Sequence, residues 1–205
     1  MTYRNDPQGI EARSFEIITS ELGIDFSDSR VEAIVKRVIH TTADFEYSKL
    51  LEFSPNAIEE GLKALKSGSS IYCDTSMIVA GINKKAFNRF GGHLYNFVHN
   101  ENVKLEAKKR GVTRSIVAME KALDNKTIKI FAIGNAPTAL YTLLEKVKEG
   151  YPKPNLIIGV PVGFVGAAES KEELKKYDIP YILTSGRKGG STVAVAIINA
   201  LEKCI

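Results

Sequence analysis

Several features that mark common classes of protein are missing from this chain. It contains no apolar run long enough to cross a bilayer, and residues 1–7 form no apolar signal segment. Its two cysteines, Cys73 and Cys204, lie far apart and make no Cys-x-x-Cys pair, which argues against a disulfide framework and a zinc site. We therefore expect a cytoplasmic protein with no membrane association and no metal site of its own.

Motifs for nucleotide cofactors and for common catalytic sites are also missing. There is no G-x-x-x-x-G-K-[ST] phosphate loop and no G-x-G-x-x-G after a strand, so a dinucleotide or S-adenosylmethionine enzyme is disfavoured. The chain has no G-x-S-x-G motif, no cysteine with a histidine near it in sequence, and no two histidines spaced i, i+4. These absences disfavour a serine hydrolase, a cysteine nucleophile and a helical zinc site.

The composition is that of an ordinary globular protein. The 205 residues are 44% hydrophobic and 25% charged, which suits one domain, 1–205, with a sizeable core. The net charge is +4 and the pI about 8.9, with lysines and glutamates interspersed. This modest excess favours an anionic small ligand. A nucleic-acid partner would rest on the basic pI alone, and the missing phosphate loop argues against it.

Strand-like and helical segments alternate after Gly68. Strands are predicted at 70–73, 94–98, 127–133, 156–160 and 180–184, and helices at 7–22, 31–44, 54–68, 113–123, 138–148, 171–176 and 192–201. Such alternation is typical of βαβ units. The predicted fold is therefore α/β: a single-domain, doubly wound, mostly parallel five-stranded sheet with helices on both faces.

Three glycine-rich loops follow predicted strands and open helices. They span 134–138, 161–169 and 185–191, and the last contains Arg187 and Lys188. Since glycine permits close backbone approach and a helix N-terminus attracts anions, the loops predict an anion-binding crevice at the carboxyl edge of the sheet. Simple turn-making, with a solvated basic turn, is the alternative for any one of them.

The helix predicted over 31–44 has one apolar face, and Ser29 with Glu32 predicts a capping box at its start. On the opposite face the spacing places Arg37, His40 and Asp44. Such a face is often merely solvated. The imidazole is nevertheless the strongest candidate for a general acid, because the other two histidines flank a predicted strand, where solvent-facing rings are common.

Two further positions suggest contact with a ligand. Ser14 lies on the apolar side of the first helix, where its hydroxyl either bonds back to a main-chain carbonyl or points into a cavity. Arg114 follows the N-cap Thr113, and an arginine at a helix start opposes the macrodipole unless it reaches an anion. Chance placement remains an equal alternative for Arg114.

Five blocks of the sequence resemble the precorrin-8X methylmutase (precorrin isomerase) family, in order and over nearly the whole chain. The blocks are EARSF (11–15), RVIHTTAD (37–44), AIGNAPTAL (132–140), GVPVGFVGAAESK (159–171) and GRKGGS (186–191). The resemblance implies a step of cobalamin biosynthesis in which a methyl group migrates from the α-carbon of pyrrole ring C to the neighbouring β-carbon. It also implies a polycarboxylate tetrapyrrole substrate, no cofactor and no external methyl donor, and a homodimer.

By the same resemblance, His40 is the catalytic residue, which protonates or hydrogen-bonds the ring C nitrogen, and Ser14, Arg37 and Arg114 bind the substrate. The residues after His40, Thr-Thr-Ala-Asp, resemble the branch that converts cobalt-precorrin-8 to cobyrinate, and any cobalt would belong to the substrate. Two alternatives stay open: the same reaction on metal-free precorrin-8X, giving hydrogenobyrinate, and a non-catalytic corrinoid carrier.

Overall fold

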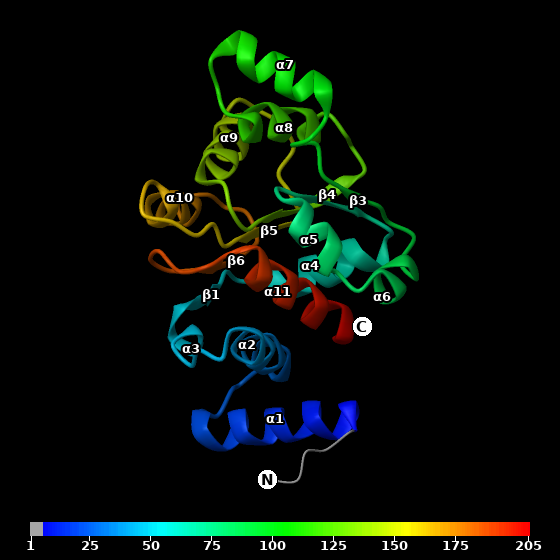
Figure 1. Ribbon diagram of the computed structural model, residues 1–205, viewed down its shortest axis with the longest axis vertical. Helices are drawn as coiled ribbons and strands as arrows, with labels where there is room; N and C mark the ends of the chain where they lie inside the picture. Colours follow the sequence, from blue (N-terminus) through cyan, green and yellow to red (C-terminus); the bar gives the residue numbers. More distant parts are fainter. Residues whose placement is uncertain (1–5) are drawn as a thin grey trace.

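A six-stranded sheet divides the molecule into two layers of helices (Figure 1). The computed structural model describes residues 6–205, and its helices and strands are counted within that range. The strand order is β1-β6-β5-β4-β2-β3, with β1 antiparallel to β6 and all other neighbours parallel. The strands are β1 Leu51–Phe53, β2 Ser70–Cys73, β3 Leu94–Tyr95, β4 Ile128–Ile133, β5 Leu156–Gly159 and β6 Tyr181–Thr184. The predicted class, a mostly parallel α/β sheet, is confirmed.

The predicted strand count was one too low. The five predicted strands correspond to β2 through β6, whereas β1 was missed. It has three residues and lies directly after a helical turn, so it offers no alternating pattern that could predict a strand. The strand predicted over 94–98 is also shorter than expected, with two residues paired to β2.

Helices cover both faces of the sheet, as the doubly wound fold predicted. One side holds α4 (Ala57–Lys66), α5 (Ser76–Gly81), α6 (Lys84–Asn88) and α11 (Ser191–Lys203), with α2 (Ser29–Thr42), α1 (Pro7–Leu22) and α3 (Tyr47–Leu50) outside them. The other holds α8 (Arg114–Leu123), α9 (Pro137–Lys148), α10 (Ala167–Leu174) and α7 (Glu101–Arg110). Figure 1 shows α1 and α7 at opposite ends of the long axis. Among the helices within 6–205, none combines the length and the apolar character that a membrane span needs.

The apolar face of α2 is buried against α11. Its residues Ile34, Val35, Val38 and Ile39 are at most 2% exposed. The helix start differs from the prediction: Asp28 is the N-cap and accepts from the main-chain N–H of Arg30, so the predicted capping box is wrong. An aspartate one position earlier caps equally well, which the capping-box pattern does not reveal.

The end of α2 also corrects a prediction. Ala43 adopts the left-handed conformation (φ 53°) and ends the helix, so Asp44 lies beyond it and not on the helical face with Arg37 and His40. The expectation that residues 1–7 form no apolar signal segment falls mainly on residues 1–5, which lie outside the described residues.

The carboxyl group of Asp74 lies at the topological switch point of the sheet, between β2 and β4, where the strand order reverses. Asp74 follows β2, next to the end of β4, and is 4% exposed. Its Oδ1 accepts from the N–H of Gly134 at 2.9 Å, and its Oδ2 accepts from Asn135 and Ala136, both at 2.8 Å. Burial raises the pKa of Asp74, and these hydrogen bonds oppose the shift. The first glycine loop, at which we expected a ligand anion, therefore binds a carboxyl group of the chain itself.

Replacing Asp74 should destabilise the fold. In Asp74→Ala, three N–H groups, two of them buried, lose their acceptor, and we expect the free energy of unfolding to fall by about 3 kcal/mol or more. Asp74→Asn should fall less, because its amide oxygen still accepts. Urea denaturation measures the change. The exposed Asp178, paired with Lys153, supplies the matched control, since Asp178→Ala should cost under about 1 kcal/mol. Equal stabilities of the two alanine variants would contradict the role of Asp74.

Candidate active site

His40 is held between α1 and α2 by two side chains of α1. Ser14 Oγ forms a 2.8 Å hydrogen bond with His40 Nδ1, and the Phe15 ring stacks on the imidazole with centroids 5.2 Å apart and an interplanar angle of 13°. When the hydroxyl donates this bond, Nε2 carries the ring proton of the neutral imidazole. No group among residues 6–205 bonds Nε2, so this nitrogen can face a ligand. Of the two alternatives for Ser14, the back-bond to the main chain is therefore replaced by a bond to His40.

Arg37 lies one turn before His40 on the same face of α2. Its Nη2 donates to Glu11 Oε1 at 2.6 Å, and its Cζ lies 4.7 Å from the centroid of the Phe15 ring. The Arg37 hydrogen bond is the main reason why the pKa of Glu11 is lowered. Phe15 thus covers both Arg37 and His40, and the two predicted α2 residues are brought together with Ser14.

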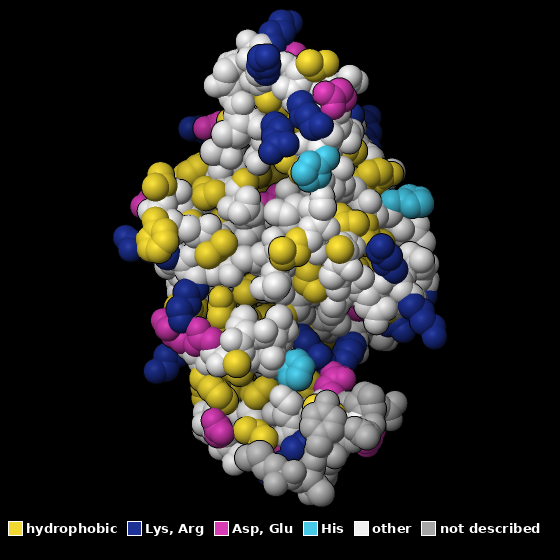
Figure 2. All heavy atoms as spheres, viewed as in Figure 1, with side chains coloured by type: hydrophobic (Ala, Val, Ile, Leu, Met, Phe, Trp, Pro, Cys, Tyr) yellow, Lys and Arg dark blue, Asp and Glu magenta, His cyan; other side chains and the backbone are white. Residues whose placement is uncertain are grey.

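A cavity of about 910 Å³ opens beside His40. Its walls come from α1, α2, the segment from Asn83 to Arg89 around α6, and the second half of α11. The glycine-rich loops do not line it; α11, which begins at the third loop, is the element that connects the two regions. The cavity that contains His40 therefore lies in the helical layer between α2 and α6, and the three loops at which the sequence predicted a crevice are not part of its wall. Figure 2 shows histidine side chains well separated over the surface, not gathered as a metal cluster would be.

Glycines in the three loops let the loops approach one another. A Cβ on Gly134 would lie 2.8 Å from Ser191 Cα, and one on Gly189 would lie 2.3 Å from the carbonyl oxygen of Val160. The loops therefore pack together at the carboxyl edge, which gives their glycines a structural reason independent of any ligand.

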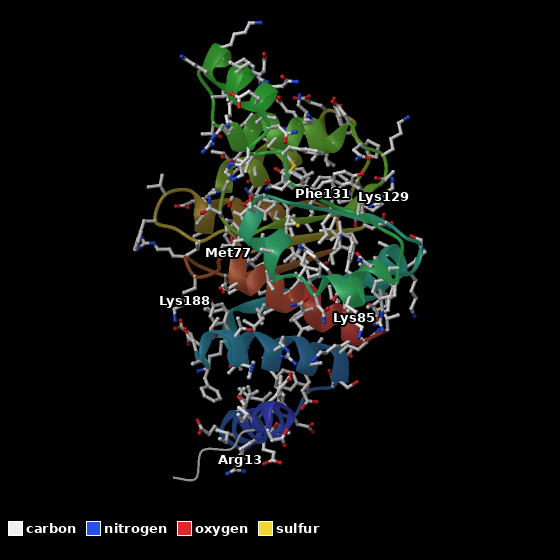
Figure 3. All side chains as sticks on the ribbon, turned by 45° about the vertical axis from the view of Figure 1, so that its right-hand side comes forward. Arg13, Met77, Lys85, Lys129, Phe131 and Lys188 are labelled. Atoms are coloured by element: carbon white, nitrogen blue, oxygen red, sulfur yellow. The ribbon has the colours of Figure 1, made fainter. Side chains whose placement is uncertain are left out.

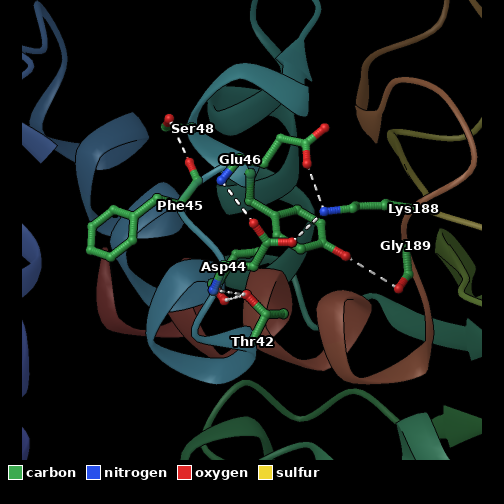
Figure 4. Close-up of polar contacts among 9 residues, drawn as sticks. Thr42, Asp44, Phe45, Glu46, Ser48, Lys188 and Gly189 are labelled. Atoms are coloured by element: carbon green, nitrogen blue, oxygen red, sulfur yellow. Dashed lines mark hydrogen bonds and ion pairs between the residues drawn. The ribbon is translucent and has the colours of Figure 1, made fainter.

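Lys188 is neutralised by acids that follow α2. Its Nζ lies 2.7 Å from Glu46 and forms a second ion pair with Asp44 (Figure 4). In Figure 3 its side chain reaches from the loop after β6 toward the end of α2. Of the two cations that the sequence suggested as ligand-binding in this loop, only Arg187 is left without a described acidic partner. It is exposed, and its Cζ lies 5.6 Å from the centroid of the Phe164 ring.

Arg114 is not brought to His40 by any described contact. It is the first residue of α8, exposed, and on the face of the sheet opposite to α2. The N-cap role of its neighbour Thr113 is confirmed, since Thr113 Oγ1 accepts from the N–H of Ile116. His93 and His99 are exposed. Within residues 6–205, no group of three or more His, Cys, Asp or Glu side chains could hold a metal ion.

Among the cavity-wall residues that the sequence did not single out, Arg89 and Glu202 have the most unusual surroundings. Glu202 is 1% exposed, and neither carboxyl oxygen has a hydrogen-bond partner among the described residues. Arg89 Nη2 donates instead to the main-chain carbonyl of Glu202 at 2.8 Å. Burial raises the pKa of Glu202 to about 7, with a smaller opposing effect of Arg89. The polar tail Glu-Lys-Cys-Ile gives no sign in the sequence that its glutamate is buried.

The buried acid should make stability depend on pH. Because the folded-state pKa of Glu202 is raised, the folded protein binds this proton more tightly than the unfolded chain. Its contribution is therefore fully present below about pH 4.5 and is lost as pH rises through 7, by up to about 3 kcal/mol. Urea unfolding between pH 5 and 8 should show this loss in the parent protein but not in Glu202→Gln. Glu16→Gln, at an exposed position, is the control and should keep the pH dependence of the parent. If the free energy of unfolding varied with pH in the same way in the parent and in Glu202→Gln, Glu202 would not be the source of the loss.

Comparison with known proteins gives one consistent answer. The model of the precorrin-8X methylmutase family matches residues 9–204. The chain is 50% identical to the cobalt-precorrin-8 methylmutase of Priestia megaterium, over 96% of this chain and 87% of that one. It is 45% identical to the enzyme of the same name from Salmonella typhimurium, over 98% and 97%. A crystal structure of precorrin-8x methyl mutase from Thermus thermophilus superposes with a TM-score of 0.87 at 38% identity, covering 95% of this chain and 96% of that chain.

The match to the family model spans nearly all of the described residues, and it includes α1 and α2, which hold Ser14, Arg37 and His40. The agreement in fold with a solved relative extends over the same range. This chain belongs to the precorrin-8X methylmutase family.

Proposed function

We propose that this protein is an isomerase of cobalamin biosynthesis that converts cobalt-precorrin-8 to cobyrinate by moving a methyl group within ring C. The curated relatives with 50% and 45% identity are both named for the cobalt-containing substrate. A methyl shift within one molecule needs no external methyl donor, in keeping with the missing S-adenosylmethionine motif. Cobalt enters the site with the substrate. The chain acts as one domain in the cytoplasm.

The observation that carries the proposal is the orientation of His40. Its Nδ1 is engaged by Ser14 and one face of its ring by Phe15, while Nε2 has no partner among residues 6–205 and the residue lines the large cavity. A ring held in this way can donate its Nε2 proton, or a hydrogen bond, to the ring C nitrogen of a bound tetrapyrrole. Such a bond stabilises the charge that develops along the conjugated ring during migration.

Ser14 sets the tautomer and the direction of the imidazole. Arg37 binds a carboxylate of the substrate, and it has donors for this because one nitrogen, Nη2, engages Glu11. Arg114 remains a substrate-binding residue by family resemblance alone. Because Arg114 lies on the opposite face of the sheet from the cavity, its substitution should weaken substrate binding less than substitution of Arg37. A larger loss of substrate affinity in the Arg114 variant would contradict this ranking.

The direct test is conversion by the purified protein without added cofactor. Cobalt-precorrin-8 should give cobyrinate, followed by the change in its visible spectrum, and it should be converted with a higher kcat/KM than metal-free precorrin-8X. Faster conversion of the metal-free compound would assign the chain to the other branch. Tight binding of cobyrinate with no turnover at any pH would instead identify a corrinoid carrier.

His40→Ala should lower kcat by roughly 10²- to 10⁴-fold, the usual contribution of general acid catalysis, while the circular dichroism spectrum stays that of the parent. Ser14→Ala should lose less, because the stacking on Phe15 still orients the ring. The exposed His99 supplies the control, and His99→Ala should keep parent activity. Full activity of His40→Ala would remove this residue from the mechanism.

We also propose that the protein is a homodimer and that the loop before α10 forms part of the interface. In this loop Phe164 is 82% exposed and Val165 89% exposed, values typical of residues that bind another surface. An edge-to-edge sheet pairing is less favourable, because the edge strands β1 and β3 have three and two residues.

Light scattering after gel filtration tests the dimer. The parent protein should have twice the 22.5 kDa mass of one chain, and the double variant Phe164→Ser, Val165→Ser should shift toward the monomer. Leu105→Ser, at a residue 61% exposed on the distant α7, should leave the mass unchanged. A monomeric parent protein would refute the dimer, and a dimeric double variant would place the interface elsewhere.

A further inference from the structure

We propose that Arg89 is a carboxylate-binding residue of the His40 cavity and that it selects ligands with an ionised acid group at the α6 wall. The inference rests on the proposed function, because it assigns a contact for the polycarboxylate rim of the corrinoid. It concerns a residue that lies on a different wall of the cavity from His40.

The other cations of the cavity wall already have acidic partners. Arg37 Nη2 lies 2.6 Å from Glu11, and Lys203 Nζ lies 3.5 Å from the same carboxylate. Arg89 is the exception within residues 6–205, since its guanidinium lies in no ion pair. Bringing an anionic ligand to Arg89 therefore requires no displacement of a protein carboxylate.

The guanidinium is held in place by uncharged groups. Its Nη2 donates to the main-chain carbonyl of Glu202 near the end of α11, and its Cζ lies 4.9 Å from the centroid of the Phe90 ring. This carbonyl is one of the last of the helix, where a cation is electrostatically favourable. One nitrogen is thereby used, and the other N–H donors remain for a planar carboxylate.

Two neighbouring amides in the wall are engaged in the fold. Asn199 Oδ1 accepts from the N–H of Asn83 at 2.9 Å, and its Nδ2 donates to the carbonyl of Gly81 at 3.2 Å. Asn83 Oδ1 accepts from the N–H of Ala86. These hydrogen bonds fix the α6 wall against α11, and Arg89 is the cation that this wall presents to the cavity.

The carboxyl of Glu202 is close to Arg89 in the chain's fold but forms no ion pair with it, so the guanidinium stays open to a ligand. Glu202 is nearly inaccessible, and Arg89 bonds its main-chain oxygen and not its side chain. A buried carboxyl with no hydrogen-bond donor favours its uncharged form. Below about pH 7, where the Glu202 carboxyl is mainly uncharged, Glu11 alone opposes the positive charges of Arg89, Arg37 and Lys203, which leaves a local excess of positive charge.

The test compares an acid ligand with its ester. Cobyrinate and its fully methyl-esterified form are titrated spectrophotometrically into the full-length parent protein, Arg89→Gln and Arg89→Lys. We expect Arg89→Gln to weaken cobyrinate binding about tenfold and to leave ester binding unchanged, with Arg89→Lys in between because it keeps the charge but loses the planar fork. With cobalt-precorrin-8, KM should rise about tenfold while kcat stays within twofold.

Arg110→Gln is the matched control, because this arginine is paired with Glu120 on the far side of the sheet and should change neither constant. Equal loss of acid and ester binding by Arg89→Gln would indicate a structural role and overturn the proposal, as would unchanged cobyrinate binding. If the parent protein binds cobyrinate but converts no substrate, the proposed function fails, while the acid-against-ester comparison still decides the role of Arg89.

Discussion

The packing of α2 on α11 is the interaction on which the site depends. Four apolar side chains of α2, each worth about 1.5–3 kcal/mol when fully buried, fix the rotation of this helix about its axis. Once that rotation is fixed, Arg37 and His40 must face α1 and the cavity, since side chains three residues apart share a helical face. A helix with a weaker apolar face could rotate and carry the imidazole away from its partners. The position of the His40 imidazole is therefore a consequence of hydrophobic burial.

Acidic side chains of the chain itself occupy most of the places that could attract a ligand anion. Asp74 fills the N–H cradle of the first glycine loop, Asp44 and Glu46 neutralise Lys188, and Glu11 pairs with Arg37. The internal pairs leave a small number of groups open to a ligand. In the proposed mode of binding, a polycarboxylate would meet open donors at Nε2 of His40 and at Arg89, and would compete with Glu11 for Arg37.

The sequence predicted the layers of the fold well and the place of the site less well. The helices α2, α9 and α11 have apolar residues at helical spacing over many residues, which predicts a helix. The strands β4 to β6 are short apolar runs between turn residues, which is typical of a buried parallel sheet. The three-residue strand β1 and the five-residue helix α6 have no such pattern, since their conformations are determined by neighbours distant in sequence. Helical spacing pointed to Arg37 and His40, and the family resemblance supplied the expected roles of His40, Ser14 and Arg37. Arg89 and Glu202 could not, since their burial and pairing arise from the contact of α6 with the end of α11.

The demands of the reaction explain why so few groups suffice. A methyl shift within one molecule brings no second substrate to position, so the protein needs to orient one macrocycle and to supply one proton. Orientation calls for contacts spread over the cavity walls, and the proposed carboxylate-binding residues Arg37 and Arg89 stand on different elements of those walls. Proton supply calls for an imidazole whose direction does not vary. The stacking of Phe15 restricts the plane of the ring, and the Ser14 hydrogen bond restricts its rotation within that plane, so Nε2 is left with a single direction toward the cavity.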